Sequence, residues 1–387
     1  MTDSRSYTNM ISQTISFLRF PLIVAVVYIH FNISRKGISV HGINYGTDNP
    51  DWYFFTINLF SSVIASIAVP LFFFISGYLF FFQKEFNRRE YLLKLQKRIK
   101  TLLIPYLLWN LIAIIFQVVR LIPFFSSIFP GAYKSEIHLS FIRVFNTFFN
   151  NTDTNGIIVS PIEYTMMEII NEPFPIDIPL WYIRDLMVMI IISPIVYWMI
   201  KKLHVCYVVG LCVIWYFGNL IIPDGGYIHM LFTSTFFFSL GSYCSIMRID
   251  FIETMQKVKY LSIIYIPIAI IDTLTLFTEY NIYIHKLGIL FGIIAVINVV
   301  SQIVKSGKLT INHLLLNSTF FIFALHKLII DDIAKVFFSM LHLPDSTFVM
   351  FTLYVVIPLI TISVCVLLYK LIKQRLPFLC FLLTGGR

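Results

Sequence analysis

The chain has 387 residues, of which 58% are hydrophobic and 13% are charged, and its mean hydropathy is +0.82. Too few polar residues remain to coat a water-soluble globule, so the composition excludes a soluble protein and indicates a polytopic membrane protein. The formal net charge is +9. Basic loops beside membrane spans account for this charge, and nothing in it calls for a nucleic-acid partner.

Ten apolar runs are long enough to cross a hydrocarbon core of about 30 Å, which takes about 20 helical residues. We therefore expect an all-α membrane protein with ten transmembrane helices, in which residues 1–387 form a single integral-membrane domain. The second and ninth runs are longer than a span needs, which predicts tilt, a kink or extension beyond the lipid. The runs are residues 14–33, 55–82, 101–122, 180–200, 204–222, 229–247, 260–278, 284–304, 314–341 and 347–371.

The placement of Lys and Arg orients these runs, because basic residues beside a span resist translocation. With the N-terminus inside, nineteen of the 29 basic residues fall in inner segments and six in outer ones. Both termini are therefore expected to be cytoplasmic, with an inner tail over 373–387. The first run lacks a cleavage site after a short core, so we expect it to remain as a span. The spacing of the five cysteines predicts neither a metal site nor a disulfide framework.

The first run contains two residues that are costly in a membrane, Arg19 and His30. Their separation of eleven residues places both on one face of a helix, about 16 Å apart along its axis. An imidazole can accept a proton near neutral pH, so His30 is a candidate general base. The alternatives are an Arg19 that snorkels to lipid phosphate and a His30 hydrogen-bonded within a helix interface.

Basic residues over 88–100 precede the third run, where they would clamp the phosphates of a cytoplasmic nucleotide-containing donor. Inner loops are basic in any case, so only Arg98, at the mouth of the third run, is a specific candidate. In the second run, Ser76 and Gly77 would let helices approach closely or let a cofactor pass. A nucleophilic role for Ser76 is disfavoured, because the expected topology places His30 nearer the opposite side.

A long outer segment covers about 123–179, and loops of this length usually carry function or structure. Residues 137–149 would form a short amphipathic helix on the membrane surface. This cap would bind an acceptor, or it would be only a lid or an interfacial anchor. The face expected to be apolar comprises Phe141, Val144, Phe145 and Phe148.

Charged and polar residues recur in the later runs. Arg184 and Asp185 begin about five residues beyond Pro179, roughly 7 Å deep, at a depth comparable with His30. Asp185 would orient the imidazole or Arg184 would hold an acidic acceptor, and a purely structural contact is the alternative. His326 is expected near mid-membrane, where it would face the same cavity as His30. The charges that follow it at four-residue spacing would neutralise one another; they are Lys327, Asp331 and Lys335.

Six segments, in order from the first run to the C-terminus, together resemble one known family. They are the Arg19 to His30 pair, the aromatic run Val69–Tyr78 ending near Ser76-Gly77, Lys97-Arg98 followed by Pro105-Tyr106, Leu180–Leu186 with Trp181, Thr319–His326, and the tail from Leu376-Pro377 to Arg387. The chain resembles the bacterial acyltransferase-3 membrane proteins, which O-acylate surface polysaccharides and related acceptors. The resemblance covers essentially the whole chain. It departs from the family pattern at Lys100-Thr101, where a second arginine is often seen, and at Tyr182, where phenylalanine is more usual.

The resemblance implies an O-acyltransferase of the bacterial inner membrane that moves acetyl from cytoplasmic acetyl-CoA to a glycan hydroxyl. Its partners would be this glycan and the lipid bilayer, and self-association into a homo-oligomer is left open. Transfer would be direct or would pass through an acyl-histidine. The remaining alternatives are a transporter or flippase of a glycan or lipid-linked sugar, and an inactive scaffold. The expected roles are catalysis for His30 and Arg19, donor binding for Arg98, Ser76 and Lys97, and acceptor binding for Arg184, Asp185, Trp181 and His326.

Overall fold

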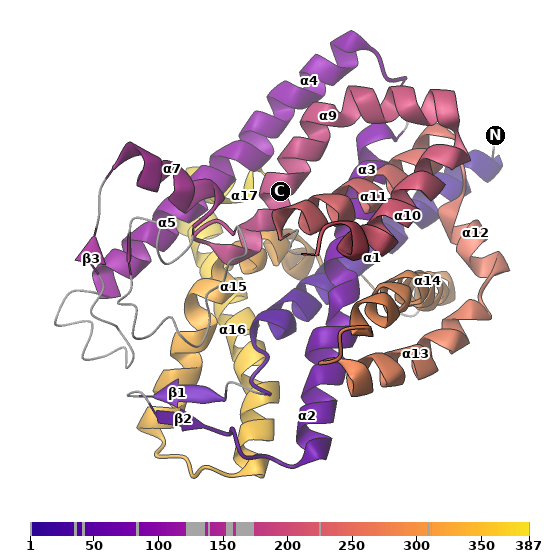
Figure 1. Ribbon diagram of the computed structural model, residues 1–387. Helices are drawn as coiled ribbons and strands as arrows, with labels where there is room; N and C mark the ends of the chain where they lie inside the picture. The colour runs from indigo at the N-terminus through magenta and orange to yellow at the C-terminus, as the bar shows by residue number, and fades with distance from the viewer. Residues whose placement is uncertain are drawn as a thin grey trace.

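The computed structural model shows a helical protein in which a helix occupies each of the ten expected runs (Figure 1). Two antiparallel pairs of short strands, β1 (Ile38–Val40) with β2 (Ile43–Tyr45) and β3 (Glu136–Ile137) with β4 (Ile158–Val159), are added to the helices. Because these strands have only two or three residues each and the other elements are helices, the all-α class is confirmed. The structure describes residues 2–34, 37–40, 43–82, 85–120, 136–137, 140–151, 158–159, 174–223, 226–307, 310 and 312–386.

The α-helices differ widely in length. In chain order they are α1 (Thr2–His30), α2 (Asp51–Asn58), α3 (Ala68–Phe81), α4 (Arg88–Arg98), α5 (Ile104–Arg120), α7 (Phe141–Phe149), α9 (Trp181–Leu203), α10 (Val205–Ile221), α11 (Tyr227–Ile246), α12 (Phe251–Lys257), α13 (Leu261–Thr275), α14 (Asn281–Ser306), α15 (His313–Met340), α16 (Thr347–Arg375) and α17 (Pro377–Thr384). Short π- or 3-10-helical turns connect some of them, namely η1 (Leu59–Ile64), η2 (Ala65–Ile67), η3 (Ile99–Leu103) and η4 (Ile178–Leu180).

Within the described residues, seven helices are long and apolar enough to cross a membrane. An eighth is added if α11 and α12, which meet at a bend of 104°, count as one span. The two other expected runs form the shorter apolar helices α10 and α13, of 17 and 15 residues. The protein is thus a polytopic membrane protein. The count of ten crossings and the cytoplasmic location of both termini stay predictions, as does the single-domain boundary.

The second run is one continuous helical segment, Asp51–Phe81, that changes winding midway. The π-helical turn η1 and the 3-10 turn η2 lie just before Pro70. Proline has no N–H and its ring clashes with the carbonyl one turn earlier, so regular α-helix is difficult at this point. The irregularity expected for this long run is therefore present, and proline gives its physical reason.

The third helical segment begins earlier than predicted. It was expected from residue 101, but α4 already begins at Arg88 and continues through η3 into α5. The Asn87 side chain accepts a hydrogen bond from the Glu90 N–H at 2.9 Å and so caps this helix. No residue of α4 is buried. A helix this polar reads as a basic inner loop in the sequence, which explains the error.

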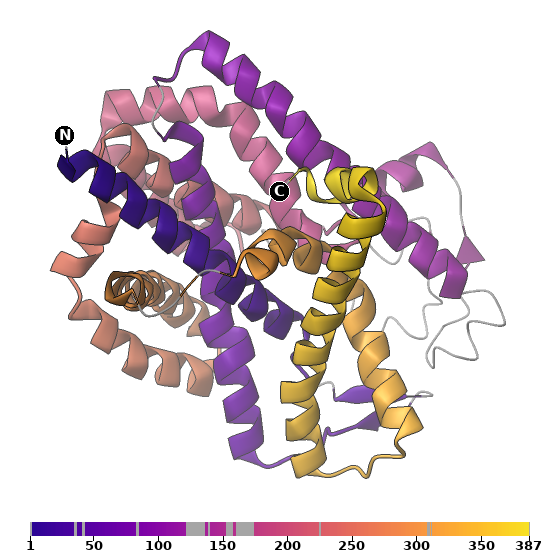
Figure 2. The ribbon, with the colours of Figure 1, turned by 180° about the vertical axis from the view of Figure 1, so that it is seen from behind.

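Helix α1 lies at the centre of the bundle, where it packs against α3, α14, α15 and α16 (Figures 1 and 2). Beside it, α3 and α11 touch backbone to backbone. A Cβ atom placed on Gly77 would lie 2.0 Å from the Phe238 carbonyl oxygen, and one on Gly241 would lie 1.9 Å from the Phe74 oxygen. The close approach of helices predicted at Ser76-Gly77 is therefore present, and Gly77 and Gly241 permit it. This contact fixes the position of α3, which carries Ser76.

Candidate active site

Two histidines from distant parts of the sequence meet at the centre of the bundle. His30 ends α1 and His326 lies within α15, and their ring centroids are 5.2 Å apart. His326 is fully buried, whereas His30 is partly exposed. The two imidazoles therefore face one region, as predicted, because α1 and α15 pack directly together.

The hydrogen bonding of His326 determines which of its nitrogens can react. Nδ1 lies 2.9 Å from the Ile322 carbonyl oxygen, which can only accept, so Nδ1 carries the proton. Nε2 is then left with a lone pair. It is buried and has no hydrogen-bond partner in the part of the chain that the structure describes. A buried acceptor without a partner is costly in a folded protein, which points to a proton or a ligand group received there.

The charges after His326 behave partly as expected. Lys327 Nζ forms an ion pair with Asp331 at 2.7 Å, one turn apart. Lys335 makes no such pair among the described residues. Lys327 also interacts electrostatically with both imidazoles. The stripe is therefore structural at Lys327 and Asp331, and it places a cation near the histidine pair.

A second cluster surrounds the Tyr182 hydroxyl near the start of α9. This hydroxyl lies 2.8 Å from Ser76 Oγ on α3. Arg19 on α1 and Arg98 on α4 both interact electrostatically with Tyr182. Ser76 and Arg98, expected at the donor site, thus lie near one phenol together with Arg19, which was expected in catalysis. Tyr182 was not predicted as a site residue, and its only signal in the sequence is the departure from the usual phenylalanine.

Tyr182 also connects the two clusters, because its ring lies 5.9 Å from that of Phe323, one turn before His326. Arg19 is exposed within a helix long enough to span, which fits both a contact with an incoming ligand and the snorkelling alternative. Lys97 is exposed on α4, and no described contact brings it to Tyr182. Trp181 packs instead against Phe73 of α3, with a ring separation of 6.1 Å. Lys97 and Trp181 therefore lie apart from the convergent residues, and their roles stay predictions.

Arg184 and Asp185 form a buried pair on α9. Arg184 Nε donates to Asp185 Oδ1 at 2.9 Å, and its Nη1 donates to the Phe149 carbonyl oxygen at 2.6 Å. The guanidinium also lies 4.4 Å from the centre of the Tyr227 ring. Within the described residues Asp185 pairs with Arg184 and not with His30. The expectation that Asp185 orients the imidazole therefore has no geometric support, and Arg184 is held between α7, α9 and α11.

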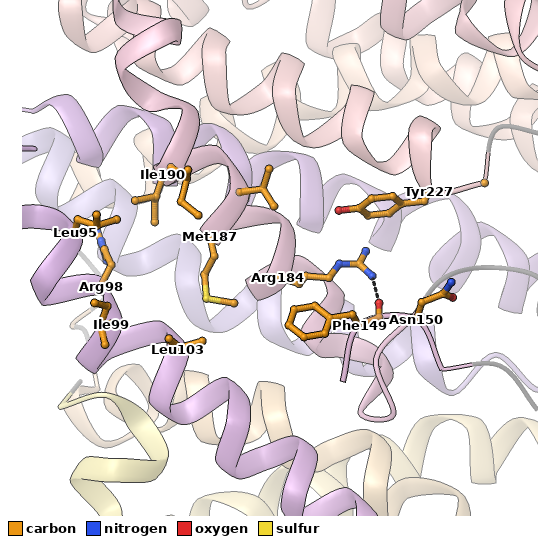
Figure 3. Close-up of a pocket in the computed structure, with 13 residues that line it drawn as sticks. Leu95, Arg98, Ile99, Leu103, Phe149, Asn150, Arg184, Met187, Ile190 and Tyr227 are labelled. Carbon is orange, nitrogen blue, oxygen red and sulfur yellow. Dashed lines mark hydrogen bonds between the residues drawn. The ribbon is translucent and has the colours of Figure 1, made fainter. Parts of the chain in front are cut away.

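A cavity of about 770 Å³ opens between Arg98 and Arg184 (Figure 3). Among the predicted site residues only these two line it, so it is separate from the histidine pair. Its lining is mostly apolar. The lining residues are Leu95, Arg98, Ile99, Leu103, Phe149, Asn150, Arg184, Met187, Val188, Ile190, Ile191, Gly226 and Tyr227.

The short helix expected over 137–149 is present as α7, capped by Ser140 Oγ, which accepts from the Arg143 N–H at 3.3 Å. Its apolar side is exposed, with Phe141 at 86% and Phe145 at 54%. An exposed apolar helix face is typical of interfacial helices. The acidic residues of this segment at 153, 163, 168 and 172, and most of 123–179, lie outside the described residues.

A family model described as an acyltransferase domain, that of the acyltransferase-3 proteins, matches residues 13–370. The chain belongs to this acyltransferase family. The motifs from Arg19 to His326 therefore identified the family correctly. Among curated proteins, the chain is 27% identical over 238 residues to the succinoglycan biosynthesis protein ExoH of Rhizobium meliloti (strain 1021). That match covers 61% of this chain and 54% of the relative, so it spans about half of that protein's length. No solved structure matches the chain.

Proposed function

We propose that this acyltransferase moves an acetyl group from cytoplasmic acetyl-CoA to a hydroxyl group of a glycan, within the bacterial inner membrane. The family supports acyl transfer. The relative is named for the biosynthesis of succinoglycan, which supports a polysaccharide or its precursor as acceptor. The observation that carries the proposal is the pair of imidazoles 5.2 Å apart, one with a buried unpartnered nitrogen. Acyl transfer to an alcohol needs such a proton acceptor.

In the proposed reaction His30 accepts the proton of the acceptor hydroxyl while its oxygen attacks the thioester carbonyl carbon. The carbon–sulfur bond breaks, the acetyl group stays on the glycan oxygen, and the thiolate of coenzyme A receives the proton. His326 would assist His30 as a second proton acceptor, because its Nε2 can accept a hydrogen bond or a proton and cannot donate a hydrogen bond. The Lys327 ammonium, which interacts electrostatically with both imidazoles, would favour the negative charge that develops on the carbonyl oxygen.

The donor is proposed to enter beside Tyr182. Arg19 and Arg98 both lie near this phenol and carry charge that matches the phosphates of coenzyme A. Ser76 and Tyr182 offer hydroxyl groups to the polar amides of its pantetheine arm. The thioester would then reach the histidine pair past Phe323, which separates the two clusters by one helical turn.

The test is acetyl transfer from radiolabelled acetyl-CoA by the purified protein to glycan from a strain that lacks the gene. We expect a glycan product heavier by one acetyl group. His30→Ala and His326→Ala should each lower the rate by about a hundredfold or more, as is usual for loss of a general base or its support. His313→Ala, on an exposed residue of the same helix as His326, is the matched control.

A folded His30→Ala protein that acetylates normally would remove the proposed base. A transporter or flippase would move its glycan unchanged and would not consume thioester. A product without added mass, found together with glycan movement, would therefore replace the proposed function by that alternative.

A further inference from the structure

The cavity lies on the side of α9 opposite Tyr182, and it shares Arg98 with the donor cluster. Tyr182 and Arg184 are two positions apart, so their side chains leave the helix about 200° apart. The cavity is formed by two facing stripes, each spaced by three or four residues. One stripe is Arg184, Met187, Val188 and Ile191 on α9, and the other is Leu95, Arg98, Ile99 and Leu103 on α4 and η3.

Two apolar residues that line this cavity are exposed on the outer surface of the helices. Ile191 is 59% exposed and Ile99 is 47% exposed, and both belong to helical segments that are long and apolar enough to span. Exposed apolar side chains in such segments face lipid chains. A cavity of about 770 Å³ that is lined by aliphatic side chains and open in this direction suits a hydrocarbon chain entering from the bilayer.

One end of the cavity is polar and positively charged (Figure 3). Arg184 is fixed there by the Phe149 carbonyl and the Tyr227 ring, and Asn150 lies beside it. The lining contains Arg184 at this end, Arg98 at the other, and no acidic residue among the described positions. Its charge therefore complements an anion, although Asp185 behind Arg184 balances part of it.

Helix α7, which lies beside this end, has the exposed apolar side of an interfacial helix. Its outward side carries Phe141 and Ile142, which are 86% and 70% exposed, as expected for a helix lying in the membrane interface. The same helix ends at Phe149, whose carbonyl holds Arg184, and Asn150 follows directly. The arginine thus lies close to the interface, and the aliphatic stripe continues from it into the membrane.

From this arrangement we infer that the cavity binds the polyprenyl-phosphate anchor of a lipid-linked glycan acceptor. Arg184 and Asn150 hold the phosphate, and the polyprenyl chain lies along Met187, Val188 and Ile191. The inference rests on the proposed function for the identity of the acceptor as a glycan. A bound anchor keeps the glycan beside the enzyme, so that its hydroxyl groups stay near the active site at high effective concentration.

The binding test uses the full-length protein in detergent and undecaprenyl phosphate as probe, read by native mass spectrometry. Val188→Trp fills the cavity and should weaken binding about tenfold or more. Ile195→Trp is the matched control, because it lies on the same stripe of α9 but is 62% exposed and outside the cavity. Arg184→Gln combined with Asp185→Asn removes both charges of the buried pair, and it should reduce binding to the level seen with phosphate-free polyprenol.

Two comparisons decide between this anchor and other ligands. Inorganic phosphate alone should bind weakly, and phosphatidylglycerol should compete poorly with undecaprenyl phosphate. Equal binding of phosphatidylglycerol would overturn the proposal in favour of an ordinary membrane lipid. Unchanged binding by Val188→Trp would overturn it as well.

A final experiment distinguishes failure of the anchor site from failure of the proposed acetyltransferase activity. Acetylation is measured on a lipid-linked glycan and on the same glycan released from its lipid. Val188→Trp should lower the ratio of the two rates about tenfold or more, whereas Ile195→Trp should leave it unchanged. An unchanged ratio in a protein that still acetylates refutes the anchor site alone. If the unaltered protein binds undecaprenyl phosphate but acetylates neither glycan, the acetyltransferase proposal fails while the lipid site stands.

Discussion

A single hydroxyl group distinguishes Tyr182 from the phenylalanine more usual at its position, and this hydroxyl contacts Ser76 at 2.8 Å. Tyr182→Phe should retain the fold, because the ring still packs against Phe73 and Phe323. The substitution removes the hydrogen bonds of this hydroxyl to Ser76 and to the Phe72 carbonyl. The donor loses a partner for one hydrogen bond of about 0.5–1.5 kcal/mol, so the KM for acetyl-CoA should rise about two- to tenfold. The measurement is a saturation curve with the donor.

The control for this substitution is Tyr207→Phe, which removes another tyrosine–serine contact, the one to Ser239 at 3.4 Å, from a different helix pair. The KM of that variant should not change. Equal KM values for the two variants would show that the Tyr182 hydroxyl has no part in donor binding.

Asp177 lies just before α9, fully buried, and both its carboxylate oxygens lack hydrogen-bond partners within the described residues. Burial raises the pKa of Asp177 well above its usual value. The folded protein therefore binds this proton more tightly than the unfolded chain does. Stability should decline as the pH rises from about 4, the unfolded value, through the folded pKa.

Asp177→Asn should abolish that part of the decline and raise the melting temperature at neutral pH, because an amide buries without charge. Melting curves of the purified protein across this pH range provide the measurement. Asp48→Asn, at an exposed residue, is the control. A melting temperature for Asp177→Asn that is lower than that of the parent at every pH would mean that the carboxylate is required in its charged form.

At this scale the sequence predicts the ionic residues better than the aromatic ones. Arg19, His30 and His326 stand out because a polar group inside an apolar run is costly and so has a reason to be there. Tyr182 is one of 21 tyrosines in a chain that is 17% aromatic, so nothing local distinguishes it. The pairing of Asp185 with Arg184 also escapes a sequence argument, since the depth of a residue does not determine which side of its helix faces His30.

Among the elements, the contact between α3 and α11 is the tightest constraint that single residues impose. A methyl group on Gly77 would have to lie 2.0 Å from the Phe238 carbonyl oxygen, so Gly77→Ala must push the helices apart. Overpacking of this kind costs typically about 1–3 kcal/mol. We expect a lower melting temperature and less acetyl transfer, because α3 carries Ser76.

Gly210→Ala in α10 is the matched control, since nothing lies within 4 Å of a Cβ atom there. That variant should be neutral or more stable by up to about 1 kcal/mol, because alanine favours helix over glycine. If the two alanine variants melt at the same temperature, the helices accommodate the methyl group and the close contact is not needed.

The positions of the elements follow from hydrophobic run length, and this works wherever a helix is surrounded by lipid or protein. It fails at α4, whose eleven residues include none that is buried, because its many basic residues give the segment the composition of a basic inner loop. Its start is nevertheless encoded locally, in the Asn87 cap and Glu90 three residues later. Capping residues therefore carry information that hydropathy alone misses.

On the scale of the whole molecule, the C-terminal end of the chain folds back toward the donor cluster. Most of the tail expected over 373–387 folds as α17, beside α5 and the C-terminal end of α16 (Figure 2). The Trp109 indole N–H donates to the Leu383 carbonyl at 2.9 Å, and Gly385 packs directly on the Thr101 backbone. The tail thus supports η3, the turn that follows Arg98, and through it one side of the donor cluster.

Removal of residues 377–387 should therefore lower the stability of the protein and weaken donor binding. It leaves the buried indole of Trp109 without its acceptor, which costs about 1–3 kcal/mol, and it frees η3 to move with Arg98. We expect a lower melting temperature and a raised KM for acetyl-CoA. Phe378→Ala, at a tail residue that is 74% exposed, should change neither quantity. A truncated protein with unchanged donor KM would mean that Arg98 is positioned by α4 alone, so that the donor cluster depends on the packing of α1, α4 and α9 and not on the chain end.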